Sequence, residues 1–502
     1  MNFSLHILSR RSRIARAISG RVTLLSFAVC GCAALMLPGC GSILTTASGS
    51  PGGNTAVTVL ATSTANDEFS EFPIQITSIA LIGQSGNAVT LLSSSPGIMP
   101  EFIHLNGPAE PIATVSVPQG VYTSAAVTIP EADFACAYFS PPNRNVTELF
   151  GKEAPSGTTV NLPAPITVTG TSMAISLNLL VSESTSLSAC TSWNISLPPP
   201  KFTPVFEVSA VATLASGSGK IKATVMHGLV TSIDVSRNSF SMAGANEGLP
   251  GNEWQIDTYS GTVFQGIGGF SQLASGLPVD LDLAIQPDGS LLATRVAVCD
   301  TDTTDLSVFY GPVEYMDDTT SQVFFLAQEQ YGYLLDQAHY YSTGSSEVPF
   351  GNAKFQISGA LSNLDSLPFA ATFTLSNIVP GQTVLWTTHD PNVTDKWPAT
   401  TVTLMPQTID GTVSAIGSEG GFTTYAVTLA PYDLFPALAV QPGQAKLLTN
   451  PNTVVVYADG NTQMLNTSPV AVGDVVRFYG LVFNDNGTLR MDCAQINDGV
   501  AE

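Results

Sequence analysis

Five ring-bearing side chains lie within eleven residues near the middle of the chain: Tyr331, Tyr333, His339, Tyr340 and Tyr341. A tyrosine ring combines an apolar face with a polar tip, which suits stacking against a sugar ring. Trp386 and Trp397 are the nearest tryptophans in the sequence that could join this group. We therefore treat these rings as a candidate ligand-binding site. The alternative is that they pack the interior of a domain or a flap over it.

A second group of polar side chains is Asp300, Asp302 and Asp305, within the segment DTDTTD. Calcium prefers carboxylate and other oxygen ligands, so this group is a weak candidate metal site, and calcium is the one cofactor considered. The segment lacks the central Gly and the terminal Glu of a helix-loop-helix calcium site. A solvated linker between two domains is the alternative.

No catalytic residues are predicted. The segment Gly217-Ser218-Gly219-Lys220 is similar to the end of a phosphate-binding loop, but Ile221 stands where that loop requires Ser or Thr. The sequence contains neither a Gly-x-Ser-x-Gly nor a His-Glu-x-x-His motif. Its many Asp and Glu leave open a carboxylate pair for glycoside hydrolysis. We therefore expect a non-catalytic protein, with a secreted carboxylate-dependent hydrolase acting on glycans as the alternative.

Four cysteines lie beyond residue 40: Cys136, Cys190, Cys299 and Cys493. In an oxidising compartment four cysteines allow three disulfide connectivities, and the sequence alone does not choose among them. Cys136 and Cys190 flank one predicted domain, so they are the expected pair. None of the four has a His or Cys neighbour at zinc-site spacing, which argues against a zinc site.

Acidic residues dominate the charge of the chain, with 39 Asp and Glu against 17 Lys and Arg and a net charge of −22. Five of those basic residues lie before Cys40, so removal of this segment would take the net charge to −27. A body this acidic is repelled by nucleic acid, which excludes a nucleic-acid partner. Only 11% of the residues are charged, so Ser, Thr, Asn and Gln must carry much of the solubility.

The N-terminal segment is built like a secretory signal. Five arginines and no acidic residue precede an apolar stretch, residues 22–37, that is too short to be a stable membrane span. It ends in Leu37-Pro38-Gly39-Cys40, which resembles the bacterial lipoprotein box, in which the cysteine is acylated and the preceding peptide is removed. The resemblance implies lipidation of Cys40 and an outer-membrane lipoprotein with its body in the periplasm or on the cell surface. The alternative is an ordinary signal peptide that is cut nearby.

Along the remaining chain, apolar residues recur with a period of two. Val279-Asp280-Leu281-Asp282-Leu283 alternates an apolar face with a carboxylate face, and residues 175–179 alternate apolar and neutral polar side chains. Both segments are typical of half-buried antiparallel strands. No window of a dozen residues offers a convincing amphipathic helix. The fold class is therefore predicted to be all-β.

The first domain contains three recognisable segments: ITSIAL at residues 76–81, VPQGVYTSAAVTI at 117–129 and ISLNLLV at 175–181. Their order resembles an uncharacterised lipoprotein domain family with a transthyretin-like β-sandwich, in which the middle segment forms a hairpin. The resemblance covers about 150 residues. It implies an N-terminal antiparallel β-sandwich and no particular activity.

The second half of the chain contains a threefold internal repeat. Each copy begins with Gly-x-Val, at Gly228, Gly311 and Gly411, and later carries Gly-x-x-Val, at Gly276, Gly381 and Gly473. Copies of 80 to 100 residues are the right size for small closed barrels, which have no exposed strand edges. They resemble a second uncharacterised family of OB-like small barrels found in tandem in bacterial envelope proteins.

The predicted organisation has six parts: a signal peptide at 1–39, a flexible tether at 40–56, a β-sandwich at 57–213, and three small β-barrels at 221–300, 306–405 and 406–498. The expected function is that of an interaction or structural module, held to the membrane through its N-terminal lipid. A polysaccharide or another envelope protein is the expected partner.

Overall fold

The structure is a computed structural model that describes residues 53–63, 72, 74–98, 100, 102, 105, 109–140, 145–153, 158–160, 162, 164–184, 203–211, 222–244, 253–286, 289–317, 322–326, 329–332, 345–359, 364–389, 398–430, 433–439, 447–464 and 469–498. Residues 50–502 form one compact unit. The predicted signal peptide and Cys40 lie outside the described residues. Within the described part of the chain, no helix has the length and apolar character needed to cross a membrane.

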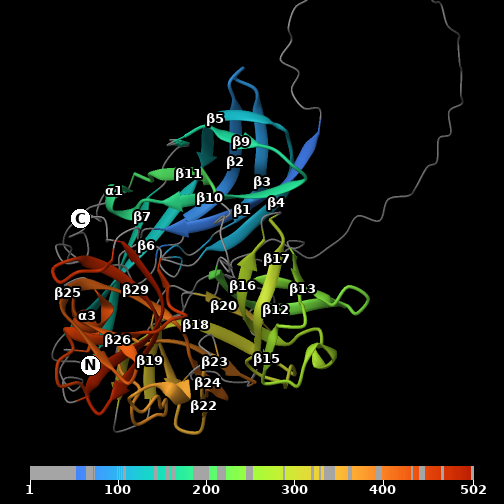
Figure 1. Ribbon diagram of the computed structural model, residues 1–502. Helices are drawn as coiled ribbons and strands as arrows, with labels where there is room; N and C mark the ends of the chain where they lie inside the picture. Colours follow the sequence, from blue (N-terminus) through green and yellow to red (C-terminus); the bar gives the residue numbers. More distant parts are fainter. Residues whose placement is uncertain are drawn as a thin grey trace, which may run out of the picture. The chain divides into compact units, whose positions relative to one another are not determined.

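The prediction of an all-β fold is confirmed (Figure 1). The α-helices among the described residues are single turns, α1 (Val181–Ser184) and α3 (Leu434–Leu438). Two 3-10 turns lie at Phe270–Gln272 and Leu364–Ser366. All other regular structure in these ranges is β-strand, arranged in five sheets.

Two sheets form the N-terminal β-sandwich. The first has the order β11-β10-β1-β4, with β1 (Asn54–Ser63), β4 (Glu110–Pro118), β10 (Ser172–Leu179) and β11 (Phe206–Ala210). The second has the order β7-β6-β2-β5-β8, with β3 paired to β2 and β9 paired to β5. Its strands are β2 (Ile74–Gly83), β3 (Ala88–Ile98), β5 (Gly120–Thr128), β6 (Glu131–Ser140), β7 (Asn145–Glu153), β8 (Thr158–Val160) and β9 (Ile166–Val168). Buried side chains of both sheets share one apolar core.

The sandwich differs from the predictions in two places. The segment at 117–129 is not a hairpin, because β4 pairs with β1 in one sheet while β5 pairs with β2 in the other. Gln119 makes the corner between the sheets, and its side chain donates to the carbonyl of Gly170 at 2.8 Å. The strand at 175–179 is not antiparallel to both neighbours, since β10 runs parallel to β1 and antiparallel to β11.

The first and third repeat copies are closed five-stranded barrels. Barrel 1 is closed by the pairing of β14 with β17, and barrel 3 by the pairing of β27 with β30. The strands of barrel 1 are β12 (Lys222–Asp234), β13 (Ser239–Gly244), β14 (Trp254–Asp257), β16 (Pro278–Ile285) and β17 (Leu291–Val298), with β15 (Val263–Gln265) added beside β17. Those of barrel 3 are β25 (Gln407–Glu419), β26 (Phe422–Leu429), β27 (Thr453–Ala458), β29 (Val475–Asp485) and β30 (Thr488–Asp498), with β28 (Gln463–Met464) beside β30.

The middle copy, barrel 2, has the strand order β21-β19-β18-β23-β24-β22, with β20 paired to β18. Its strands are β18 (Ser307–Asp317), β19 (Gln322–Leu326), β20 (Glu329–Gly332), β21 (Ser345–Pro349), β22 (Lys354–Ile357), β23 (Thr383–Thr388) and β24 (Thr401–Leu404). Its core is aromatic, and the fully buried Trp386 ring stacks on Phe309 at a centroid distance of 4.2 Å.

The two repeat motifs are explained by one contact that recurs in every barrel. The backbone N–H of the glycine in Gly-x-x-Val donates to the carbonyl of the valine in Gly-x-Val: Gly276 to Val230, Gly381 to Val313 and Gly473 to Val413, at 2.7 to 2.8 Å. These three glycines have φ values of +88°, +95° and +98°. Residues other than glycine rarely adopt a positive φ, so this turn explains why each copy of Gly-x-x-Val begins with glycine.

The same strand register makes equivalent positions of the barrels comparable. The glycine of Gly-x-Val pairs with the valine of Gly-x-x-Val in all three copies. The adjacent pair, on the outer face of each barrel, is His227 with Asp280 in barrel 1, Tyr310 with Leu385 in barrel 2 and Asp410 with Arg477 in barrel 3.

These outer faces are buried against other barrels. Asp280 is 1% exposed, and the ring of His227 in barrel 1 stacks on that of Tyr310 in barrel 2 at a centroid distance of 4.4 Å. The sequence alternation at 279–283 correctly predicted a strand. It was wrong about burial, because the carboxylate face meets a neighbouring barrel rather than water.

Candidate functional site

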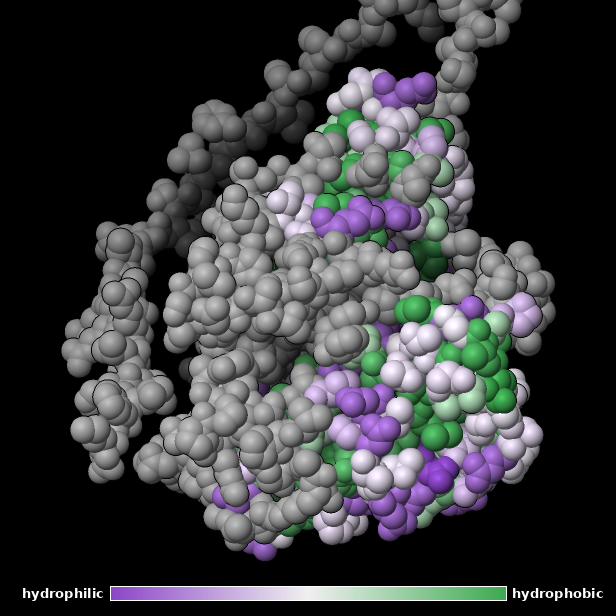
Figure 2. All heavy atoms as spheres, turned by 90° about the vertical axis from the view of Figure 1, so that its left-hand side faces the viewer, coloured by the Kyte–Doolittle hydropathy of each residue, from purple (hydrophilic) through white to green (hydrophobic). Residues whose placement is uncertain are grey.

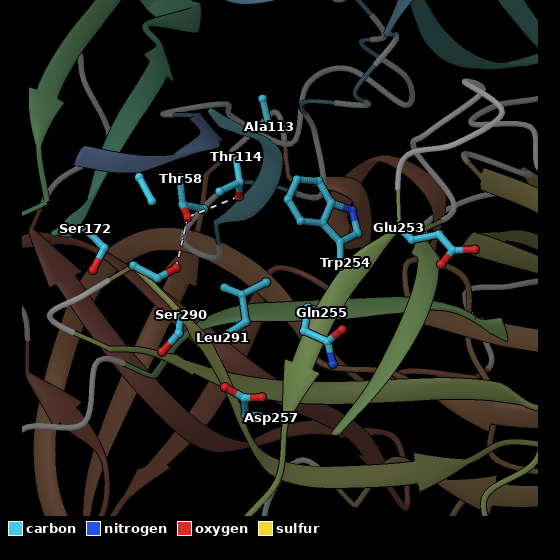
Figure 3. A pocket seen from close by; sticks show the side chains of 12 residues that line it. Thr58, Ala113, Thr114, Ser172, Glu253, Trp254, Gln255, Asp257, Ser290 and Leu291 are labelled. Carbon is cyan, nitrogen blue, oxygen red and sulfur yellow. Dashed lines mark hydrogen bonds between the residues drawn. The ribbon is translucent and has the colours of Figure 1, made fainter. Parts of the chain in front are cut away.

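A cleft of about 570 Å³ lies between the sandwich and barrel 1, and we call it the sandwich–barrel cleft (Figure 3). One wall consists of Ala56, Thr58, Ala113, Thr114 and Ser172. The other consists of Glu253, Trp254, Gln255, Asp257, Gly289, Ser290 and Leu291. The lining therefore combines hydroxyl, amide and carboxylate groups with one indole ring, and none of these residues is basic.

Strand β14 places most of the polar groups of the barrel wall. Glu253, directly before the strand, and Gln255 are exposed and Asp257 is half-buried, whereas Trp254 and Ile256 are buried. Trp254 is 6% exposed and belongs to the barrel core, yet its indole Nε1 has no hydrogen-bond partner among the described residues. Figure 3 shows this ring between Thr114 on one side and Glu253 on the other. A buried donor without a partner is costly, so an acceptor from a ligand or solvent would stabilise this wall.

The two walls are joined at the turn between β16 and β17. The Thr58 hydroxyl donates to the carbonyl of Gly289 at 2.9 Å, and it also lies 3.2 Å from the hydroxyl of Thr114. Gly289 has a φ of +78°, and a Cβ atom there would lie 2.7 Å from the carbonyl oxygen of Met173. Sandwich residues Leu60, Ala109 and Ala174 also belong to the apolar cluster of barrel 1. The cleft therefore has walls fixed by packing rather than a loose gap between separate domains.

The predicted aromatic site is only partly described. Tyr333, His339, Tyr340, Tyr341 and Trp397 lie outside the described residues, and of Tyr331 only the backbone is described, in β20. Trp386 is fully buried in the core of barrel 2, so it cannot stack on a ligand. That part of the prediction is corrected.

The segment at 300–305, which contains the three aspartates, links barrels 1 and 2 and is held in place by hydrogen bonds to barrel 2. The Asp300 carboxylate accepts from the Thr387 hydroxyl at 3.1 Å and contacts His389 Nε2 at 3.1 Å, while His389 Nδ1 lies 2.8 Å from the Thr304 carbonyl. Asp302 accepts from the backbone N–H of Thr304. Within the described part of the chain, no three His, Cys, Asp or Glu side chains are grouped so that they could hold a metal ion. Asp300, Asp302 and Asp305 thus do not converge on one point.

The environment of His389 favours its charged form. Burial by itself lowers the pKa of this imidazole, but the Thr304 carbonyl and the Asp300 carboxylate outweigh it and raise the pKa above its ordinary value. With oxygen acceptors at both ring nitrogens, a doubly protonated ring satisfies both contacts.

The cysteines divide between described and undescribed parts of the chain. Cys299 and Cys493 are buried free thiols. Cys190 lies outside the described residues, and only the backbone of Cys136 is described, in β6. The expected Cys136–Cys190 disulfide stays a prediction.

The described surface offers no broad apolar patch for docking. Its exposed large hydrophobic residues, scattered over the sandwich and barrels 1 and 3, are Val121, Val235, Val263, Ile416, Met464 and Val472. On the face drawn in Figure 2, hydrophilic and hydrophobic residues alternate over short distances. Single exposed apolar residues are ordinary on soluble surfaces. The clefts are therefore the better candidates for ligand binding.

One family comparison bears on this site. Residues 227–297 match the family model of a domain of unknown function (DUF5666). The DUF5666 region begins within β12 and ends within β17, so it contains the whole barrel wall of the sandwich–barrel cleft. This match agrees with the resemblance of the repeat copies to small barrels of unknown function. The chain matches no curated protein.

Sequence reasoning did not single out Trp254. The signal was present, because NEWQID alternates the apolar Trp254 and Ile256 with polar residues, as a half-buried strand does. Its cleft could not be foreseen, since the opposite wall lies more than 80 residues away in the sandwich.

Proposed function

We propose that this chain is a lipid-anchored, non-catalytic protein of the bacterial envelope whose sandwich–barrel cleft binds a polysaccharide. The observation that carries the proposal is the chemistry of the cleft, in which four hydroxyl side chains and one amide line the two walls together with Trp254. Sugars present many hydroxyl groups and apolar ring faces, and sites of this kind suit them. Anchoring through Cys40 rests on the sequence of the N-terminal segment alone.

The spacing of the carboxylates supports binding without turnover. Glu253 and Asp257 are four residues apart at one strand, so at about 3.3 Å per residue their Cα atoms are about 13 Å apart. The paired carboxyl groups of glycoside hydrolases lie about 5 to 9.5 Å apart. Figure 3 shows the Glu253 and Asp257 carboxylates apart, with Gln255 between them. The alternative, a carboxylate-dependent hydrolase, needs two acidic groups at the closer spacing, and Glu253 and Asp257 are the acidic groups that the described lining of this cleft supplies.

A glycan-array screen of residues 41–502, with and without calcium, tests the proposal, with mass spectrometry of bound sugars to detect cleavage. We expect binding without turnover and without a calcium requirement. Release of cleaved sugar would favour the hydrolase. Silence on the whole array would favour an envelope protein as the partner.

Matched variants connect any binding to this cleft. Gln255→Ala removes an exposed amide of the barrel wall, and Thr114→Ala removes a hydroxyl of the sandwich wall. Each should weaken binding about fivefold, because one neutral hydrogen bond contributes about 1 kcal/mol. Thr423→Ala, at an exposed strand position of barrel 3, is the control and should leave binding unchanged. Equal effects of all three substitutions would place the ligand elsewhere.

A further inference from the structure

A second cleft, of about 420 Å³, lies between barrels 1 and 2, and we call it the inter-barrel cleft. Barrel 1 contributes residues of β15, β16 and the end of β17, and barrel 2 contributes β22, the turn at 364–365 and β24. Three hydrogen bonds cross it: Ser358 Oγ donates to Asp280 Oδ2 at 2.8 Å, Gln356 Nε2 donates to the Cys299 carbonyl at 3.1 Å, and Gln265 Nε2 donates to the Gly359 carbonyl at 3.5 Å. Its walls are therefore held in place before any ligand binds.

Asp280 is the group in this cleft that needs explanation. Its side chain is 1% exposed, and its Oδ2 accepts from Arg295 at 2.7 Å and from Ser358. Its other oxygen, Oδ1, is buried without a hydrogen-bond partner among the described residues. A buried carboxylate oxygen without a donor is costly. A donor that enters the cleft would supply the missing bond.

The sister barrels show that the fold does not require an acid at this position. Leu385 occupies the equivalent position in barrel 2, and Arg477 occupies it in barrel 3. Arg295, the partner of Asp280, is replaced by Thr401 in barrel 2 and Gln495 in barrel 3 at the equivalent cross-strand site. Because apolar and neutral residues build the same barrel, the buried Asp280–Arg295 pair is a feature of barrel 1 and not of the repeat.

The charge of the cleft selects the kind of donor. Asp280 and Asp282 share the single guanidinium of Arg295, and Asp365 adds a carboxylate at an exposed position of the cleft. None of the described lining residues is basic. A positively charged donor is therefore favoured over a neutral or an anionic one.

We propose that the inter-barrel cleft binds a small organic cation with N–H donors, which Asp280 Oδ1 accepts at the buried end and Asp365 at the exposed end. An ammonium group fits both conditions, since it carries a charge and several donors. This site is separate from the proposed glycan cleft, whose lining residues are all different.

Three small alcohols separate charge from N–H donation: ethanolamine, choline and ethylene glycol. Ethanolamine has an ammonium with N–H donors, choline has the charge without N–H donors, and ethylene glycol has neither. We expect calorimetry on the full chain to show ethanolamine binding at least about tenfold more tightly than the other two. Equal binding of all three, or no binding of ethanolamine, would overturn the proposal. Displacement of ethanolamine by calcium alone would also overturn it, in favour of a metal site.

Substitutions locate the binding within the cleft. Asp280→Asn should abolish ethanolamine binding, and Asp365→Asn, at an exposed position, should weaken it at least threefold. Asp282→Asn is the matched control, because Asp282 shares Arg295 but does not line the cleft. If Asp280→Asn does not fold, the effect of Asp365→Asn still shows whether ethanolamine binds in this cleft.

The thiol of Cys299 gives a further readout in the unaltered protein. Cys299 lines the cleft, whereas Cys493 is buried in the core of barrel 3. We expect ethanolamine to slow alkylation of Cys299 by iodoacetamide and to leave Cys493 unchanged, as measured by peptide mass spectrometry. Protection of both thiols to the same degree would indicate general stabilisation and contradict the proposed site.

Discussion

At the scale of single residues, the three barrels carry different side chains at the positions where they meet. The outer face of barrel 1 carries Arg295 between Asp280 and Asp282, and that of barrel 3 carries Arg477 against Asp410 at 3.3 Å. All but Asp282 of these groups are nearly inaccessible to solvent. Removing one partner of a buried ion pair leaves an uncompensated charge, which costs more than the pair contributes.

Arg295→Gln tests this consequence in barrel 1. The substitution leaves Asp280 and Asp282 without their guanidinium, so we expect a loss of about 3 to 5 kcal/mol in the free energy of unfolding. Urea denaturation measures it. Arg237→Gln is the control, because Arg237 is 80% exposed and its pairing with Asp234 is a surface contact that should contribute almost nothing. Similar losses of unfolding free energy in both variants would show that the burial of Arg295 does not make its ion pairs more important for stability than a surface pair.

Asp433 in barrel 3 should make stability depend on pH. Burial, helped by the nearby Asp410 carboxylate, raises the pKa of Asp433 to about 8, although its oxygens accept from the backbone N–H groups of Phe435 and Asp410. The folded state thus holds a proton that the unfolded state, with a pKa of about 3.9, releases earlier. Its contribution is complete below about pH 4 and is lost as the pH rises toward 8, by up to about 1.4 kcal/mol per pH unit.

Asp433→Asn separates this effect from other titrations. Asparagine also serves well at a helix N-cap, so α3 should keep its first turn. We expect urea denaturation between pH 4 and 8 to show a smaller decline in the variant than in the natural chain. An identical decline in both proteins would assign the pH dependence to other groups.

At the scale of elements, turns and linkers connect the barrels to their neighbours. The turn between β16 and β17 packs against β1 and β10 of the sandwich, and the segment at 300–305 is held by His389. Each of these two connections is short and contacts a specific partner, so a single substitution can weaken one of them without changing the other.

Gly289→Ala should destabilise the joint between sandwich and barrel 1. Gly289 needs a positive φ, and a Cβ atom there would collide with the Met173 backbone. We expect the free energy of unfolding, measured by chemical denaturation, to fall by about 2 kcal/mol or more. Both the conformational strain and the displaced packing contribute to this loss. Gly170→Ala shares the positive φ, at +74°, but its Cβ would meet no atom within 4 Å. In this control only the conformational strain should lower the free energy of unfolding.

The linker at 300–305 should become easier to cut as the pH rises. The raised pKa of His389 means that its contacts with Asp300 and Thr304 contribute fully below the unfolded pKa of about 6.5 and are lost as the pH rises through the folded value. Limited proteolysis with proteinase K at pH 6 and pH 9 measures cleavage within Asp300–Asp305. His389→Gln should remove the difference between the two pH values for this segment. We also expect cleavage near Gly217-Ser218, in a Gly- and Ser-rich segment outside the described residues, and this second site serves for comparison.

Much of this element structure was predictable, for local reasons. Period-two alternation identified the strands. Asn486-Gly487, with φ values of 52° and 89°, forms the turn between β29 and β30, and an Asn-Gly pair between two strands is a strong hairpin signal. The corner at Gln119 was missed because a hairpin and a sheet-to-sheet crossing use the same tight-turn residues. The parallel pairing of β1 with β10 was missed because it joins strands more than 100 residues apart.

At the scale of the whole molecule, the sandwich and barrels share apolar cores. Leu60 and Ala174 of the sandwich pack in the core of barrel 1, and Leu481 and Phe483 of barrel 3 pack in the core of barrel 2. The clefts arise at these shared boundaries, so their existence depended on contacts between distant segments. The strands that line the clefts could therefore be predicted from local sequence patterns, whereas the clefts themselves could not.

Shared cores predict that barrel 1 is less stable when it is expressed alone. Residues 221–300 would expose apolar surface that the sandwich covers, together with the charged face around Arg295. We expect faster hydrogen exchange at β17 and stronger binding of an apolar dye than in residues 50–502. A fragment of residues 50–300 restores the sandwich contacts and should recover much of the protection. Full protection in the isolated fragment would show that barrel 1 folds independently of the sandwich.

The central place of β1 in its sheet has a mechanical consequence. The proposed lipid anchor would transmit any pull from the membrane to the start of this strand, which is paired over eight residues with β10 and over eight with β4. A force along the strand loads these hydrogen bonds together, in shear, whereas a force on an edge strand would open them one after another. Because Ala56 and Thr58 of this strand also line the sandwich–barrel cleft, a tether that enters through β1 can bear tension while the wall that they form keeps its shape.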